Sequence, residues 1–224
     1  MRLLAIETAT DNCSVALLAA GELRCRSNST PRNHAQSVLG MVEECLQEAN
    51  LELNDLDALV FGRGPGSFTG LRIAVGVVQG LAFGASLPVI PVSSLAAHAA
   101  AIYRAHEQDR VAVCVDARMG ECYWGVFQID EVGVPQLLDQ ERLGAPGELP
   151  GLEGGDWFGS GSGWGAYPAL NARYGAVLCG TDDTLLPEAS DLLASAGQKL
   201  KSGRVLKAEM ALPVYLREQV AWRN

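Results

Sequence analysis

Closely spaced metal-binding residues are missing from this 224-residue chain. It has three scattered histidines and six cysteines, and no two cysteines form a C-x-x-C pair. Structural zinc sites need four such ligands at short spacing, and disulfide frameworks are typical of small secreted domains. We therefore predict reduced and mostly buried cysteines, with neither a zinc cage nor a set of disulfides.

Recognised catalytic and phosphate-binding motifs are missing as well. The sequence contains no H-E-x-x-H and no G-x-S-x-G, so we expect no peptidase activity. A Walker A loop needs a lysine after its last glycine, but Leu71 and Arg72 follow Gly70. The dinucleotide fingerprint G-x-G-x-x-G also fails, because Gly64, Gly66 and Gly70 are spaced G-x-G-x-x-x-G.

No uninterrupted apolar run is long enough for export or membrane insertion. The first run ends at Glu7, and the stretch 71–92 is interrupted by Arg72, glycines and two prolines. An apolar fraction of 48% with 19% charged residues is typical of a well-packed globular protein. We therefore predict a cytoplasmic protein that makes no membrane contact.

The chain also has no excess of basic over acidic residues, since its formal net charge is −9. Residues 1–105 carry 7 basic and 9 acidic side chains, and residues 106–224 carry 10 and 17. Because proteins that grip nucleic acid by themselves normally show a basic face, tight direct binding of nucleic acid is disfavoured. We interpret two small basic clusters as solvated surface or as the rim of a protein complex: Arg24, Arg26 and Arg32, and Lys199, Lys201, Arg204 and Lys207.

Apolar patterning predicts hairpins and helices in the first half of the chain. An amphipathic helix is expected over 38–49, entered after Pro31 and capped by Asn33. A glycine-rich corner at 62–72 then leads into a second helix. The predicted strands are 3–6, 14–18, 23–27 and 56–61.

The second half repeats this opening. A strand over 111–115, a turn over 116–120 and a returning strand over 122–129 copy the first hairpin. Residues 131–155 are rich in glycine and proline and predict a loop with an edge strand, and a last helix is expected over 188–200. These patterns predict a duplicated α/β fold with mixed sheets, in two lobes of residues 1–105 and 106–224.

The corner at 62–72 is the most informative segment. Its glycines permit close backbone approach, and Ser67 is placed to cap the following helix. Amides at such a helix start attract phosphate or carboxylate groups. The alternative is that the glycines only bring helix and strand together.

A nucleotide site would need amides, hydroxyls and carboxylates around phosphates and Mg²⁺. Such groups occur at the corner and at the two hairpin turns. The first turn, however, lacks the glycine that wraps a phosphate closely, so its threonine and aspartate also fit a purely structural turn. The candidate nucleotide-binding residues are Thr8, Asp11, Gly66, Ser67, Thr69 and Asp116.

A second candidate surface lies on the helix after the corner. Gly76, Gly80 and Gly84 are four residues apart, so one side of the helix has no side chains and another helix can approach it. The approach is either close packing within the domain or a contact between subunits. The other residues assigned to this contact, in this chain or another, are Val38, Leu39, Val42, Leu46 and Arg72.

Four ordered motifs give the chain a family resemblance. They are Ile6-Glu7-Thr8-Ala9-Thr10, the corner string from Gly64 through Ile73, Asp116-Ala117-Arg118-Met119-Gly120-Glu121 with Tyr123, and Pro213-Val214-Tyr215-Leu216-Arg217. Together they resemble the TsaB family, also called YeaZ, over nearly the whole chain. The resemblance implies an actin, sugar kinase and Hsp70 type of fold, in which the turns at 8–12 and 116–120 face each other.

The same resemblance implies a role in making threonylcarbamoyladenosine at adenosine 37 of tRNAs that read codons beginning with A. It implies an accessory subunit that forms a heterodimer with the transferase TsaD through its first two helices, pairs with a second copy when alone, and works with the ATPase TsaE. Contact with tRNA would then be indirect. ATP or ADP would be bound chiefly by TsaD and TsaE, so no cofactor of its own is expected.

Catalytic relatives of the TsaD type bind a metal through two histidines four residues apart on a helix. Here His98 and His106 are eight apart, roughly 12 Å along a helix, which is too far for one ion. We therefore expect a non-catalytic subunit. The alternatives are an independent ATP-binding kinase or ATPase and, less favoured, a metalloprotease.

Overall fold

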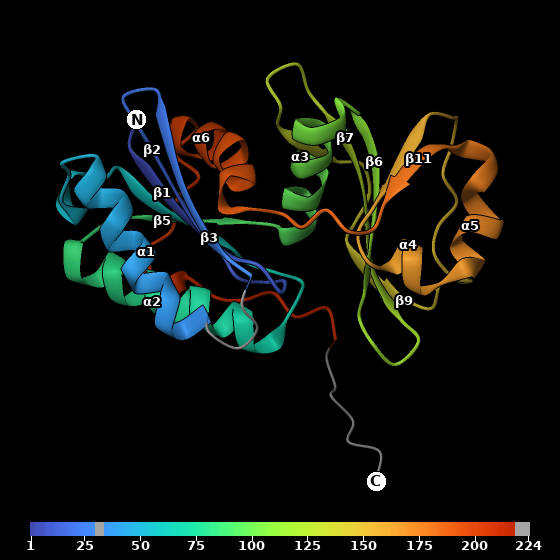
Figure 1. The fold of residues 1–224 in the computed structure, drawn as a ribbon, viewed down its shortest axis with the longest axis horizontal. Coiled ribbons are helices and arrows are strands. Elements are labelled where there is room, and N and C mark those ends of the chain that lie inside the picture. Colours follow the sequence, from blue (N-terminus) through green and yellow to red (C-terminus); the bar gives the residue numbers. More distant parts are fainter. Residues whose placement is uncertain (30–33, 218–224) are drawn as a thin grey trace, which may run out of the picture.

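Two β-sheets form the centres of two lobes in the computed structural model, which describes residues 1–29 and 34–217 (Figure 1). The strand order is β3-β2-β1-β4-β5 in the first sheet and β11-β10-β6-β7-β8 in the second, where β9 also pairs with β7. The first sheet contains β1 (Leu3–Glu7), β2 (Cys13–Ala19), β3 (Glu22–Asn28), β4 (Ala58–Gly62) and β5 (Val89–Val92). The second contains β6 (Arg110–Asp116), β7 (Cys122–Ile129), β8 (Pro135–Leu137), β9 (Arg142–Gly144), β10 (Trp157–Ser160) and β11 (Leu178–Asp182).

Both sheets follow the same plan. β1 pairs antiparallel with β2 and parallel with β4, just as β6 pairs antiparallel with β7 and parallel with β10. Beyond these, β3 and β8 extend the antiparallel side, and β5 and β11 extend the parallel side. The predicted duplicated α/β fold with mixed sheets is therefore confirmed.

Helices cover both faces of the first sheet. On one face, α1 (His34–Glu48) and α2 (Phe68–Ala85) bury their apolar sides against the strands. On the other face lie the 3-10 helix η3 (Ala189–Leu192) and α6 (Leu193–Lys201). Figure 1 shows α6 and the α1–α2 pair on opposite sides of the sheet. α2 is apolar and long enough to span a membrane by composition alone, but its buried residues belong to this core.

The second sheet is covered by α3 (Ser94–His106) on one face and by α4 (Gly163–Ala166) and α5 (Pro168–Tyr174) on the other. The predicted boundary between residues 105 and 106 thus follows the sheets but not the helices. All of α3 except His106 lies before it, yet α3 packs on the second sheet, whereas α6 lies after it and returns to the first, because each sheet has two apolar faces to cover. The remaining 3-10 helices are η1 (Leu53–Asp55), η2 (Gly175–Val177) and η4 (Ala208–Met210).

Most of the predicted elements are present with shifted ends. The six predicted strands and the helices after Pro31 and after the glycine corner are confirmed, and the predicted helix over 188–200 is η3 followed by α6. The loop over 131–155 contains two three-residue strands, β8 and β9. The short elements β5, β10, β11, α4 and α5 were not predicted. The proposed cap at Asn33 lies outside the described residues.

Candidate functional site

The glycine corner packs against the end of β1. A Cβ atom at Gly66 would lie 2.6 Å from the carbonyl oxygen of Ala9, and one at Gly70 would overlap the carbonyl of Thr8. The amide of Ser67 donates to Ala9 O at 2.8 Å, which fixes this approach. These glycines therefore bring helix and strand together, which is the structural alternative considered above.

Glu7 lies at the centre of this contact, in space that the absent side chain of Gly62 leaves open. Its carboxylate is fully buried and accepts hydrogen bonds from the Ala9 amide at 2.7 Å and from the Ser94 hydroxyl at 3.1 Å. Burial raises the pKa of Glu7 to about 7, against the opposing effect of these hydrogen bonds. Because Ser94 opens α3, Glu7 joins the first sheet to the helix that covers the second. The sequence marked Glu7 only as the acidic end of a strand.

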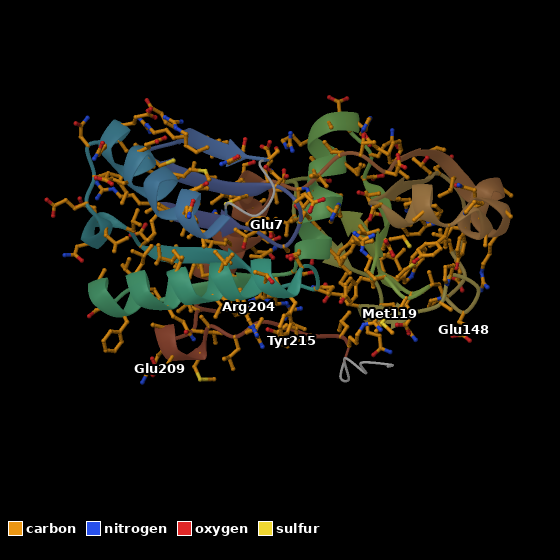
Figure 2. The ribbon with its side chains drawn as sticks, turned by 60° about the horizontal axis from the view of Figure 1, so that its bottom comes forward. Glu7, Met119, Glu148, Arg204, Glu209 and Tyr215 are labelled. Atoms are coloured by element: carbon orange, nitrogen blue, oxygen red, sulfur yellow. The ribbon has the colours of Figure 1, made fainter. Side chains whose placement is uncertain are left out.

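A cleft of about 860 Å³ lies between the lobes. Both hairpin turns line it, so they face each other as the family resemblance implied. Figure 2 shows Tyr215 and Met119, two residues of its lining, where the lobes meet. From the first lobe and α3, the residues that line the cleft are Ala9, Thr10, Asp11, Gly66, Ser67, Phe68 and His98. The other lining residues are Val115, Asp116, Ala117, Arg118, Met119, Tyr123, Ser162, Leu186, Tyr215 and Arg217.

Four of the six candidate nucleotide-binding residues line this cleft: Asp11, Gly66, Ser67 and Asp116. The assignment of Thr8 and Thr69 needs correction. Thr8 is fully buried and donates its hydroxyl to Gly70 O at 2.7 Å, so it holds the corner instead of facing the cleft. Thr69 is exposed on α2 and is not part of the cleft lining.

Asp116 is already engaged by neighbouring groups. Its carboxylate accepts hydrogen bonds from Tyr167 Oη at 2.7 Å and from the amide of Arg118 at 2.8 Å, and it forms an ion pair with the Arg118 guanidinium at 3.1 Å. Partial burial acts to raise the pKa of Asp116, but the hydrogen bonds from Tyr167 and Arg118 outweigh it and lower the pKa. The carboxylate is therefore ionised and partly used in holding the second turn.

The two histidines of α3 occupy separate environments. His98 lines the cleft with only 3% of its surface exposed, and its Nδ1 has no hydrogen-bond partner in the described chain. Burial lowers the pKa of His98 to about 4, so the ring is neutral. His106 instead contacts Asp182 at 3.0 Å and stacks on Phe158. Sequence analysis treated His98 only as one of a widely spaced pair and missed its place in the cleft.

Residues 211–217, here called the C-terminal strap, connect the lobes along the cleft. The Val214 amide donates to Arg63 O at 2.8 Å, and Tyr215 lies against Phe68 with ring centroids 5.4 Å apart. At its end, Arg217 forms an ion pair with Glu121 at 2.7 Å, in the β6–β7 hairpin. One end of the strap is thus held by the first lobe and the other by the second.

The exposed side of α2 is a second candidate site. Gly76, Gly80 and Gly84 are exposed there, and a Cβ atom at any of them would meet nothing within 4 Å. Phe83 beside them is 80% exposed, and Leu39 of α1 is 52% exposed. We call these five residues the glycine face. Close packing of the stripe inside the described chain is therefore excluded.

The other residues that sequence analysis assigned to this contact lie in two different environments, the core and the surface. Val38, Val42 and Leu46 were assigned to the contact, but all three are buried in the core of the first lobe, because that side of α1 packs on the sheet. Their assignment to a surface between subunits is therefore wrong. Arg72 lies at the surface, where it stacks on Phe68 at 3.7 Å and donates to the hydroxyl of Tyr215.

Comparison with known proteins establishes the family. The family described as TsaD, tRNA N6-adenosine threonylcarbamoyltransferase, matches residues 28–223. The tRNA threonylcarbamoyladenosine biosynthesis protein TsaB of Escherichia coli K12 is 44% identical, covering 100% of this chain and 98% of that protein. The protein of the same name in Haemophilus influenzae is 38% identical, covering 100% and 97%. The solved structure of YeaZ from Pseudomonas aeruginosa has a TM-score of 0.87 at 45% identity and covers 96% of this chain and 99% of that chain. The chain therefore belongs to the TsaB (YeaZ) family.

Proposed function

We propose that this chain supports the formation of threonylcarbamoyladenosine at adenosine 37 of tRNA as a non-catalytic subunit that binds TsaD. Its TsaB relatives are named for this biosynthesis, and the matched family is that of the transferase. In this proposal TsaD transfers threonylcarbamoyl from threonylcarbamoyl-AMP to N6 of the adenosine, and TsaE assists. The contribution of this chain is a binding surface, the glycine face.

The energetic cost of the glycine face is the observation that carries the proposal. Each glycine inside a helix costs about 1 kcal/mol relative to alanine, so three cost roughly 3 kcal/mol. Since an added Cβ atom would meet nothing within 4 Å, no contact within the described residues requires them. A helix of another subunit that approaches the α2 backbone closely would account for this cost.

The neighbouring side chains favour the same use. Burying the exposed ring of Phe83 in an interface contributes about 1.5–3 kcal/mol, because apolar surface is removed from water. Leu39 contributes exposed apolar surface from α1, and Arg72 lies four residues before Gly76 on α2. The same face would serve a second copy of the chain when TsaD is absent, so homodimer and heterodimer should compete for it.

Replacing Gly80 by leucine tests the face directly. The side chain projects into open space, so the monomer should fold normally while a close helix–helix approach is blocked. We expect co-purification with TsaD to be lost and transfer in the reconstituted system to fall. Gly175→Leu is the matched control, because Gly175 also has nothing within 4 Å but lies in the second lobe. Unchanged TsaD binding by Gly80→Leu would remove the glycine face from the interface.

Catalysis is tested separately. The purified chain, given threonylcarbamoyl-AMP and tRNA, should form no modified adenosine until TsaD is added. Formation of product without TsaD would refute a non-catalytic role, whatever the Gly80→Leu variant does.

A second candidate function is ATP binding in the inter-lobe cleft. It is favoured by the size of the cleft and by the unpartnered Nδ1 of His98, with Asp11, Ser67 and Asp116 close to the same space. Calorimetric titration with ATP and Mg²⁺ decides between the candidates. Tight binding that Asp11→Ala abolishes, with turnover by the chain alone, would favour an independent ATPase or kinase.

A further inference from the structure

The lysines of this chain are gathered in one place. The sequence has only three, Lys199, Lys201 and Lys207, within nine residues, and Arg204 lies among them. No aspartate or glutamate occurs between Asp191 and Glu209. In a chain with a net charge of −9, this segment is a local surplus of four positive charges.

The fold adds a fifth cation from a distant part of the sequence. Lys199 Nζ donates to Pro91 O at 2.6 Å, and the Arg204 amide donates to Lys199 O at 2.8 Å. The Arg63 amide donates to Val92 O at 2.8 Å, so its side chain begins beside the same end of β5. We call Arg63, Lys199, Lys201, Arg204 and Lys207 the basic edge. Figure 2 shows Arg204 in the first lobe.

Neutralisation of this edge is incomplete. Glu141 pairs with Arg63 at 3.5 Å, and its carboxylate also accepts the hydroxyl of Ser93. Burial lowers the pKa of Lys199 to about 8, and repulsion by Arg63 and Arg204 acts in the same direction against the attraction of Glu141. In addition, the Nε atom of Arg63 is buried without a hydrogen-bond partner in the described chain. Among the described residues, no carboxylate forms an ion pair with Lys201, Arg204 or Lys207, which are exposed, so these three cations are available to an anion.

We propose that the basic edge contacts the phosphate backbone of the tRNA while the complex modifies it. This inference rests on the proposed function, which brings tRNA to the complex. Lys201, Arg204 and Lys207 are exposed. Because this chain is acidic overall, a polyanion such as RNA is attracted only to the part of its surface where positive charges are concentrated. An acidic protein is the weaker fit, because lysine is depleted from protein interfaces and three of these five residues are lysines.

The position of the edge agrees with this use. Lys207 and Phe83 line the same shallow groove of about 510 Å³, so the basic edge adjoins the glycine face through which TsaD is proposed to bind. An RNA strand held by the edge would therefore lie next to the transferase. The contact is auxiliary, which is compatible with the excess of acidic over basic residues in both halves of the sequence.

Acetylation of lysines tests the contact without any substitution. On this chain an amine-acetylating reagent can modify only the three lysines and the amino terminus. In the complex with TsaD, added tRNA should slow acetylation of Lys201 several-fold and leave the amino terminus unchanged, as measured by mass spectrometry. Unchanged acetylation of all three lysines would overturn the proposal. Protection of the exposed Lys201 and Lys207 before RNA is added, in the complex but not in the free chain, would assign the edge to a protein partner and also overturn it.

Charge removal supplies the functional test. Lys201→Gln with Arg204→Gln should raise the KM for tRNA, leave kcat unchanged at saturating tRNA, and leave TsaD co-purification intact. In a plot of log KM against log salt concentration, each phosphate contact contributes a slope of about 0.9. The double variant loses two contacts, so the ratio of KM at 200 mM salt to KM at 50 mM salt should fall roughly tenfold. Arg2→Gln with Arg24→Gln removes the same charge elsewhere in the first lobe and should leave KM and its salt dependence at wild-type values.

The outcomes separate this inference from the proposed function. If the wild-type chain neither binds nor activates TsaD, the proposed function fails. If it does both, but the Lys201 and Arg204 double variant keeps the wild-type KM and salt dependence, only the tRNA contact fails.

Discussion

Replacing Glu7 by glutamine should stabilise the protein increasingly as the pH rises. Glu7 is fully buried, and burial raises its pKa from 4.5 to about 7. Between these pH values the folded protein retains a proton that the unfolded chain has released. The free energy of unfolding therefore falls as the pH rises, and the stabilisation present below pH 4.5 is lost above pH 7.

The magnitude follows from the size of the shift. A difference of about 2.5 pKa units corresponds to roughly 3 kcal/mol at neutral pH and above. Glutamine has nearly the same shape, accepts the Ala9 amide and donates to the Ser94 hydroxyl, so it removes the charge and keeps the contacts. For a chain of this length, roughly 3 kcal/mol corresponds to a melting temperature about 6–12 °C higher.

Thermal melts of wild type and Glu7→Gln at pH 5.5, 7 and 8 provide the assay. The gap between the two proteins should grow from about 1.4 kcal/mol at pH 5.5 to roughly 3 kcal/mol at pH 8, since one pKa unit is worth 1.36 kcal/mol. Glu148→Gln, which removes an exposed carboxylate, is the control and should show no such growth. A gap of equal size at all three pH values would refute the reasoning, because it would show that Glu7 is charged throughout.

Three further substitutions test the cleft and the glycines. Burial lowers the pKa of His98 from 6.5 to about 4, so the wild-type protein loses stability as the pH falls through this range. Between pH 7 and pH 4, the free energy of unfolding of His98→Gln should fall by roughly 3 kcal/mol less than that of the wild type, as measured by melting temperatures. A difference between the two proteins that is the same at both pH values would contradict a buried neutral ring. Gly70→Ala should destabilise the chain by about 1–3 kcal/mol because its methyl group overlaps Thr8 O, whereas Gly80→Ala should stabilise it by about 1 kcal/mol. Denaturation by urea measures both glycine variants, and shifts of the same sign would mean that the two glycine sets do not differ in their surroundings.

The duplicated hairpins were predictable because their information is local. Each apolar strand, polar turn and returning strand lies within about twenty residues, and a polar turn separates the two apolar runs. The four-residue strands β5 and β10 are not part of such a hairpin. β5 also contains Pro91. In sequence this proline predicts the end of an element, but it is accommodated because β5 is an edge strand, whose outer side makes an isolated bridge from Val89 to Leu206.

The candidate site was less predictable because it depends on contacts distant in sequence. The glycines of the corner indicated a close approach, but the atoms that approach belong to Thr8 and Ala9, some sixty residues earlier. The apolar stripe of α1 indicated a covered face, and a stripe by itself does not say whether a sheet or another subunit covers it. Arg63 and Lys199 likewise come together only through their contacts around the end of β5.

A continuous set of contacts links the surroundings of the glycine face to the cleft. Arg72, beside the glycine face, stacks on Phe68, and Phe68 packs against Tyr215 of the C-terminal strap. Arg217 at the end of that strap is held by Glu121 in the second lobe. Because the strap is anchored in both lobes, a change in the angle between them must either break the Arg217 ion pair or move Tyr215 against Phe68. A partner that fixes Arg72 in an interface would therefore resist such a change.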